Sequence, residues 1–303
     1  MQIEIVLSHD PSRLLVADFE TEWNRLSVDM VNLILSVFEA PTLLMQGEEA
    51  AFWQRLQIFK ALTEWTDDDL KEWEASDLQT GATHDEWLFM LKATVEKATG
   101  FLFVDDGDGL TISPRLTKNP IPWIKVADKK GTVQKYYAAH ATDEDPLSNV
   151  TLNEMSQLFA LYEAWRSEGD IKHLNQLIAI LYRKAKPKTA ENVKRNYDGD
   201  IREPLETYQS GIDRRAALLQ AHLSQNMKRV IAFHIVSCRA KLSELYPNLF
   251  TRSQNTEGGD WLDFVLELGD YDITKNALIL QQDAHDALTT AERLVKRNKT
   301  KAK

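Results

Sequence analysis

The acidic segment Asp105-Asp-Gly-Asp-Gly109 could support chemistry, because clustered carboxylates are typical ligands of calcium. An EF-hand loop places carboxylates at alternate positions and a bidentate glutamate at its twelfth position. Counted from Asp105, the third position is Gly107 and the twelfth is Leu116. The segment therefore does not match a calcium loop, and its glycines predict a tight hairpin turn instead.

Histidine and cysteine could provide a metal centre or an activated thiol. None of the seven histidines stands four residues from another, so no helix presents two imidazoles on one face. The single cysteine, Cys238, excludes an intrachain disulfide and any zinc site that needs two thiolates. His234 precedes Cys238 by one helical turn, but the stretch is apolar and offers no third group to orient them. We interpret the pair as part of a buried helix face.

The motifs of nucleotide-binding and hydrolytic enzymes are absent from the sequence. It contains no G-x-x-x-x-G-K-[ST], no G-x-G-x-x-G and no G-x-S-x-G. Phosphate-binding loops need backbone donors freed by glycine, and none of the 12 glycines is arranged in that way. We therefore expect a protein that is not an enzyme and that uses no metal and no cofactor.

Two basic stretches could contact a partner. One lies between residues 183 and 202, and the other is the lysine-rich tail. Basic residues beside aromatic rings can neutralise phosphates and stack on bases, so nucleic-acid binding is one alternative. The net charge of −10 argues against it and favours a protein partner.

Tryptophan offers a second type of interface residue. Six of the eight tryptophans lie in the first 125 residues, mostly at helical spacing typical of a core. Trp73, between Glu72 and Glu74, is expected to be exposed and to anchor an interface. The candidate partner-binding residues are Trp73, Arg183, Lys184, Lys186, Lys188, Arg195, Tyr197 and Arg202.

The elements that must position these residues are mostly helices. Helical periodicity and capping residues recur along the chain, including Ser27, Thr66 and the capping box Thr151-Leu-Asn-Glu154. A short strand is expected at 3–7, and a turn at Gly258-Gly259 is expected before the segment Trp261–Leu268. The expected helices are the stretch from Pro11 to Trp23, 28–39, 48–62, the helix opened by Thr66, 85–99, the helix opened by Thr151, 171–181, 203–222, 225–245 and 273–297.

The spacing of apolar residues changes from a helical to a strand-like pattern between residues 101 and 140. Residues 101–104 and 110–113 predict one hairpin, and residues 121–126 and 133–139 predict a second. We expect a mainly α (α+β) fold, a helical bundle with a small antiparallel β-hairpin insertion. Its regions are an acidic helical region at 1–100, the insertion at 101–146, and a helical region at 147–303 with the basic loop 183–202 and the lysine-rich tail.

Charge is unevenly distributed along the chain. Residues 1–150 contain 13 Lys and Arg against 26 Asp and Glu, whereas residues 151–303 contain 23 against 20.

No apolar window approaches the roughly 18–20 residues of a membrane helix, and no basic signal-peptide region precedes the first apolar run. Together with the single cysteine, these features predict a cytoplasmic protein.

Seven short segments carry a family resemblance, and we refer to them as the resemblance segments. They are Leu116-Thr-Lys-Asn-Pro120, Asp145-Pro-Leu-Ser-Asn-Val-Thr-Leu-Asn-Glu154, Leu177-Ile-Ala-Ile-Leu-Tyr-Arg183, Gly199-Asp-Ile-Arg-Glu-Pro204, His234-Ile-Val-Ser-Cys-Arg239, Tyr246-Pro-Asn-Leu-Phe250 and Trp261-Leu-Asp263. In their order, from about Trp23 to the end of the chain, the sequence resembles a poorly characterised family from phage and prophage tail-gene clusters.

Members of that family are similar to tail assembly chaperones. The resemblance implies a helical, non-enzymatic protein that binds another phage tail protein, in the cytoplasm of a bacterial host cell. It carries over no catalytic residues. A structural component retained in the virion and a homo-oligomer are the alternatives within the binding class. Asp200 and Arg202 could pair across the turn at the start of the next helix. The length and polarity of loop 183–204 make that loop the expected binding surface.

Overall fold

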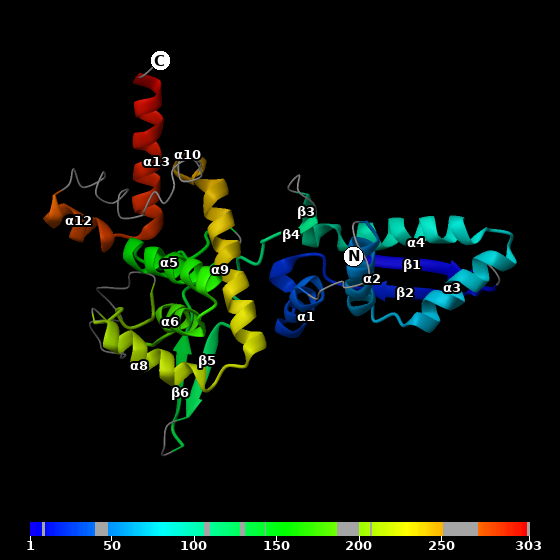
Figure 1. The fold of residues 1–303 in the computed structure, drawn as a ribbon, viewed down its shortest axis with the longest axis horizontal. Coiled ribbons are helices and arrows are strands. Elements are labelled where there is room, and N and C mark those ends of the chain that lie inside the picture. Colours follow the sequence, from blue (N-terminus) through cyan, green and yellow to red (C-terminus); the bar gives the residue numbers. More distant parts are fainter. Residues whose placement is uncertain are drawn as a thin grey trace. The chain divides into compact units, whose positions relative to one another are not determined.

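The structure, a computed structural model, describes residues 1–7, 10–39, 48–105, 110–127, 131–142, 144–186, 200–206, 208–250 and 272–301. The chain divides into two compact units, Met1–Ser113 and Pro114–Lys303 (Figure 1). Both contain helices and small antiparallel sheets, so the predicted mainly α fold class is confirmed. None of the helices in the described ranges combines the length and apolar character of a membrane span.

The first unit begins with a β-hairpin. Strand β1 (Gln2–Leu7) pairs antiparallel with β2 (Asp10–Asp18), and Gln2 lies opposite Asp18. The expected strand is thus confirmed, but the helix predicted after Pro11 is wrong. Exposed Leu14 and Val16 alternate with partly or fully buried neighbours, which is the two-residue period of a strand. Pairing with β1 therefore makes residues 10–18 a strand rather than the predicted helix.

Four helices follow in the first unit, and side-chain caps define the start of three of them. The Ser27 hydroxyl accepts from the Met30 amide at 3.2 Å, and Thr66 and Thr83 each form a complete capping box. The predicted cap residues Ser27 and Thr66 are therefore confirmed. The helices are α1 (Val28–Glu39), α2 (Glu48–Thr63), α3 (Asp67–Gln79) and α4 (His84–Thr99).

Aromatic rings pack edge to face through the core of the first unit. The Trp73 ring lies 6.5 Å from Trp65 and 6.2 Å from Trp87, centroid to centroid, and Trp65 lies 5.5 Å from Phe59. Only 4% of Trp73 is exposed, so the prediction that it anchors an exposed interface is wrong. Its acidic sequence neighbours lie beside the core position of the tryptophan without making it a surface residue.

The two predicted hairpins are present but do not share a sheet. Strands β3 (Phe103–Asp105) and β4 (Leu110–Ile112) form a two-stranded sheet in the first unit. Strands β5 (Trp123–Ala127) and β6 (Val133–Tyr137) join β7 (Arg183–Lys184) in a three-stranded sheet of the second unit. The division at Ser113 therefore runs through the region expected to be a single insertion.

The second unit is built around a nearly fully buried helix. Every residue of α6 (Ile171–Leu181) from Leu174 onward is buried, and α5, α8 and α9 contact it. The other helices of this unit are α5 (Leu152–Glu168), α8 (Gln209–Gln220), α9 (Gln225–Leu245), α10 (Pro247–Phe250), α12 (Ile273–Leu280) and α13 (Ala284–Lys301).

Two predicted helices of this unit have different limits. The helix expected from residue 203 begins only at Gln209: residues 203–206 have no helical structure, and Tyr208 has an extended backbone. The helix expected over 273–297 is interrupted after Leu280, where the Asp283 carboxylate accepts from the backbone amide of His285 at 2.9 Å and starts α13. The expected turn at Gly258-Gly259 and the segment Trp261–Leu268 lie outside the described residues.

Candidate functional site

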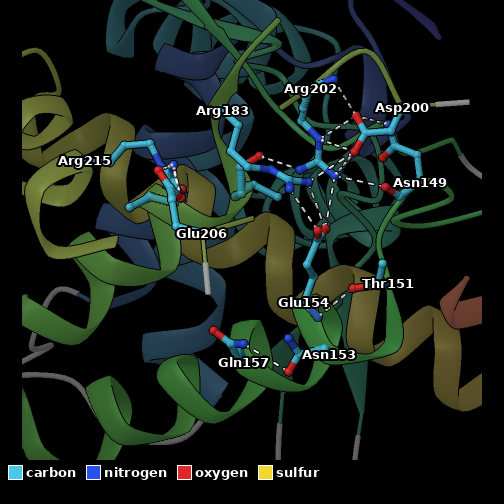
Figure 2. A network of polar contacts seen from close by, with 12 residues as sticks. Asn149, Thr151, Asn153, Glu154, Gln157, Arg183, Asp200, Arg202, Glu206 and Arg215 are labelled. Carbon is cyan, nitrogen blue, oxygen red and sulfur yellow. Dashed lines mark hydrogen bonds and ion pairs between the residues drawn. The ribbon is translucent and has the colours of Figure 1, made fainter. Parts of the chain in front are cut away.

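Four charged side chains meet in the interior of the second unit, and we call them the arginine cluster: Glu154, Arg183, Asp200 and Arg202 (Figure 2). The exposed fractions of their side chains are 7%, 1%, 13% and 0%. Glu154 lies in the first turn of α5 and Arg183 begins β7, while Asp200 and Arg202 belong to an extended segment. Residues far apart in the sequence thus share one buried site.

Each carboxylate of the cluster binds both arginines. Glu154 Oε1 lies 2.9 Å from Arg183 Nη1, and Glu154 Oε2 lies 3.3 Å from Arg202 Nη2. Asp200 Oδ2 lies 3.2 Å from Arg183 Nη2 and 2.8 Å from Arg202 Nη2. Two cations and two anions balance in the interior, which is the condition under which buried charges are tolerated. The predicted pairing of Asp200 with Arg202 is confirmed.

Backbone pairing brings the two arginines together. Arg183 lies opposite Tyr137 in the sheet, and an isolated antiparallel bridge joins Ala185 to Arg202. The Lys186 amide donates to the Ile201 carbonyl at 2.8 Å, so the two flanks of segment 187–199 lie side by side. The arginine cluster therefore fixes the base of the expected basic loop.

Arg202 also saturates two buried carbonyl groups. Its Nη1 donates to the Leu181 carbonyl and its Nη2 to the Asn149 carbonyl, both at 3.0 Å. These bonds link the end of α6 to the turn before α5. A planar guanidinium with five donors suits this role, which a lysine could not fill.

The predicted capping box at Thr151 is only half formed. The Thr151 hydroxyl accepts from the Glu154 amide at 3.2 Å, as expected for an N-cap. The Glu154 carboxylate, however, binds Arg183 and Arg202 instead of completing the box. Charge-assisted bonds to two buried guanidinium groups are stronger than one bond to a backbone amide. The Glu154 carboxylate therefore binds the two arginines rather than the Thr151 amide.

The electrostatics of the cluster follow from burial. Burial lowers the pKa of Arg183 most, the charge of Arg202 lowers it further, and the two carboxylates act in the opposite direction. The ordinary pKa of a guanidinium is so high that Arg183 remains charged. Its Nε has no hydrogen-bond partner among the described residues, although the side chain is buried.

A second arginine pair joins α8 to the segment that precedes it. Arg215 bonds to Glu206 through Nη1 and donates from Nε to the Ala179 carbonyl at 2.6 Å. Gly211 makes this arrangement possible, because a Cβ at that position would lie 2.9 Å from the Glu206 Cβ. The missing side chain lets Glu206 fold back over the helix.

A polar pocket of about 760 Å³ lies against the arginine cluster. All its lining residues belong to the second unit, and they come from residues 149–151 and the start of α5, from β7 and Lys186, from the segment 200–206, from the start of α8, and from the end of α12 with Asp283. The polar lining side chains include five carboxamides: Asn149, Asn153, Gln157, Gln209 and Gln281. Of the predicted partner-binding residues, Arg183, Lys186 and Arg202 line the pocket.

The predicted partner-binding residues do not form a single surface. Arg183 and Arg202 are buried in the cluster, so they cannot contact a partner while it is intact. The Lys184 ammonium lies 5.7 Å from the centre of the Tyr136 ring. Trp73 belongs to the other unit. Lys188, Arg195 and Tyr197 lie outside the described residues.

Asn153, Gln157 and Glu154 belong to the site although the sequence does not predict it. Asn153 and Gln157 face the pocket at a spacing of one helical turn, and Glu154 was interpreted only as a capping residue. A carboxylate in the capping box gave no signal of a second role. The amide pair was visible as a spacing, but nothing in the sequence distinguishes it from other polar pairs on helices.

His234 and Cys238 lie in the core, as predicted. The imidazole donates from Nδ1 to the Leu116 carbonyl at 3.0 Å, and the thiol lies 3.6 Å from the Thr117 carbonyl oxygen. Burial lowers the pKa of His234 to about 4, and the bond to Leu116 opposes this only in part. Burial also raises the pKa of the Cys238 thiol. The pair is therefore neutral at pH 7.

Within the described ranges, no group of three or more His, Cys, Asp or Glu residues is arranged to hold a metal ion. Comparison with models of protein families gives no match for the chain. Comparisons with curated proteins and with solved structures give no significant match either.

Proposed function

We propose that the protein acts in the assembly of a phage or prophage tail and binds another tail protein in the cytoplasm of the bacterial host. The observation that carries the proposal is the order of the resemblance segments, together with where those segments lie. Three of them supply the whole arginine cluster: 145–154 contributes Glu154, 177–183 contributes Arg183, and 199–204 contributes Asp200 and Arg202.

A second contact joins two further resemblance segments. His234 and Cys238, of segment 234–239, contact the backbone of Leu116 and Thr117, of segment 116–120. Segments that match only as short pieces of sequence thus contact one another across more than a hundred residues. This pattern supports the interpretation that the resemblance concerns a common helical unit rather than isolated similarities.

The chemistry of the site supports binding rather than bond cleavage. A carboxylate that acts as a general base or nucleophile must be available to the substrate, but both carboxylates of the cluster are bound by two arginines. The cluster instead stabilises the wall of a pocket. A rigid wall beside a solvent-accessible pocket is the arrangement expected of a binding protein.

Purification of the tagged protein from its native lysate tests the proposal, with copurifying proteins identified and counted. One tail protein in a defined ratio is the expected result. Deletion of the gene should leave particles without normal tails, and normal tails in the deletion strain contradict the proposal. Quantitative proteomics of purified particles separates an assembly factor, which is absent from them, from a structural component, which is present in stoichiometric amounts.

A further inference from the structure

We infer that the polar pocket binds an extended peptide segment, which is the part of the partner protein that this chain recognises. The inference rests on the proposed function, because it names the chemistry of the partner. It concerns only the second unit, in which the pocket and the arginine cluster lie.

The carboxylates of the pocket wall are already bound within the second unit. Glu154 and Asp200 are neutralised by Arg183 and Arg202, and Glu206 is bound by Arg215. Asp283 accepts backbone hydrogen bonds at the start of α13. A ligand with a full charge would therefore have to disrupt existing pairs, whereas a neutral polar ligand would not.

The carboxamides of the pocket have hydrogen-bonding capacity left over. On α5, Gln157 Nε2 donates to Asn153 Oδ1 at 3.1 Å (Figure 2). This bond leaves one amide oxygen and one amide nitrogen of the pair without a partner among the described residues, whichever way the two carboxamides are turned. Both residues are only half-buried, so a ligand can reach them.

A third carboxamide is also partly available. Gln209 donates from Nε2 to Asp213 at 3.1 Å, which leaves its amide oxygen to accept a further bond. A carboxamide carries the same donor and acceptor groups as a peptide unit. Carboxamides on α5 and α8 can therefore bind successive backbone N–H and C=O groups of an extended chain.

Exposed apolar side chains are sequence neighbours of several lining residues. Ile201, Tyr208 and Leu278 are 45%, 78% and 61% exposed, and each lies next to a lining residue in sequence. Large apolar side chains on a surface mark protein interaction sites, and tyrosine is enriched among residues that dominate binding. A peptide can bury its side chains against them while its backbone occupies the pocket.

The peptide does not bind by adding a strand to the neighbouring sheet. Segment 201–203 lies at the edge of that sheet, but its Arg202 amide is already bound by the Asp200 carboxylate at 2.9 Å. Pro204 follows and has no amide proton to donate. Neither Arg202 nor Pro204 can donate a backbone amide to an added strand, so the side-chain amides of the pocket bind the peptide.

Selection from a random library of 12-residue peptides on the immobilised full chain tests this inference. Selected peptides are then titrated, by fluorescence anisotropy, against wild type and against Asn153→Ala with Gln157→Ala. We expect at least about a tenfold loss of affinity for the double variant, since two hydrogen bonds are removed. The control is Gln225→Ala with Asn226→Ala, an exposed amide pair on α9 outside the pocket, which should bind as wild type does.

A scan of the best peptide with single N-methyl groups identifies the backbone contacts. At least one position should lose binding about tenfold, because N-methylation removes an amide donor. The inference is overturned if no peptide is selected, if the double variant binds like the control, or if no N-methyl position matters. Normal tails after gene deletion would instead contradict the proposed function, whatever the peptides do.

Discussion

At the scale of single residues, every charge of the arginine cluster is paired with an opposite charge. Each of its four members is more than four-fifths buried, and each binds two oppositely charged partners. Removing one carboxylate would leave two guanidinium groups facing a single anion in the interior. Such a loss is more destabilising than the loss of an exposed pair, because a buried charge cannot be compensated by water.

Glu154→Ala should therefore lower the free energy of unfolding by about 3–5 kcal/mol. The matched control lies on the same helix: Glu163→Ala removes an exposed ion pair with Arg239 and should change stability by about 1 kcal/mol or less. Urea denaturation followed by circular dichroism measures both. Equal effects of the two substitutions would contradict the assignment of the cluster as a stabilising centre.

His234 gives a prediction for pH dependence. Its pKa is about 4 in the folded protein and near 6.5 in the unfolded chain. Between these values the unfolded state binds more protons, so stability falls as pH decreases from 6.5 to 4. The loss from this one residue is about 3 kcal/mol.

His234→Asn should remove that loss, because an asparagine can still donate to the Leu116 carbonyl but does not titrate. Denaturation curves of wild type and variant at pH 7 and pH 4 isolate this residue from the carboxylates, which titrate in both proteins. An identical loss of stability in the two proteins would mean that His234 is accessible to protons in the folded state.

At the scale of elements, sequence signals were sufficient where the determining contact is local. The caps of Ser27 and Thr66 and the pairing of Asp200 with Arg202 each join residues at most three positions apart. Strand β2 was predicted as a helix because its partner β1 is not encoded in its own residues. The contact between Glu154 and Arg183 joins residues 29 positions apart, so the sequence around either residue does not predict it.

Gly169 illustrates a local signal with a measurable consequence. It ends α5 with φ of +72°, a conformation that disfavours any residue with a Cβ. Gly169→Ala should destabilise the protein by about 1 kcal/mol. Gly100 ends α4 with φ of −57° and has open space around its Cβ position, so Gly100→Ala should stabilise by about 0.4–1 kcal/mol. Urea denaturation would contradict this account if both changes had the same sign.

At the scale of the whole molecule, charge divides at the same point as the fold. Residues 1–113 contain 7 Lys and Arg against 22 Asp and Glu, a net of −15, whereas residues 114–303 contain 29 against 24, a net of +5. The asymmetry seen in the sequence is therefore larger when the chain is divided at the structural boundary than at its midpoint. Each unit also has its own buried core, which is the condition for independent folding.

Fragments 1–113 and 114–303, expressed separately, should each fold. The full chain should then unfold in two transitions whose midpoints match those of the fragments, because each core is completed within its own unit. Calorimetry and circular dichroism measure this directly. Fragment 114–303 carries every lining residue of the pocket, so it should keep the affinity of the full chain for a selected peptide, and fragment 1–113 should have none. An unfolded 114–303 fragment, or a single cooperative transition of the full chain, would mean that the two units stabilise one another.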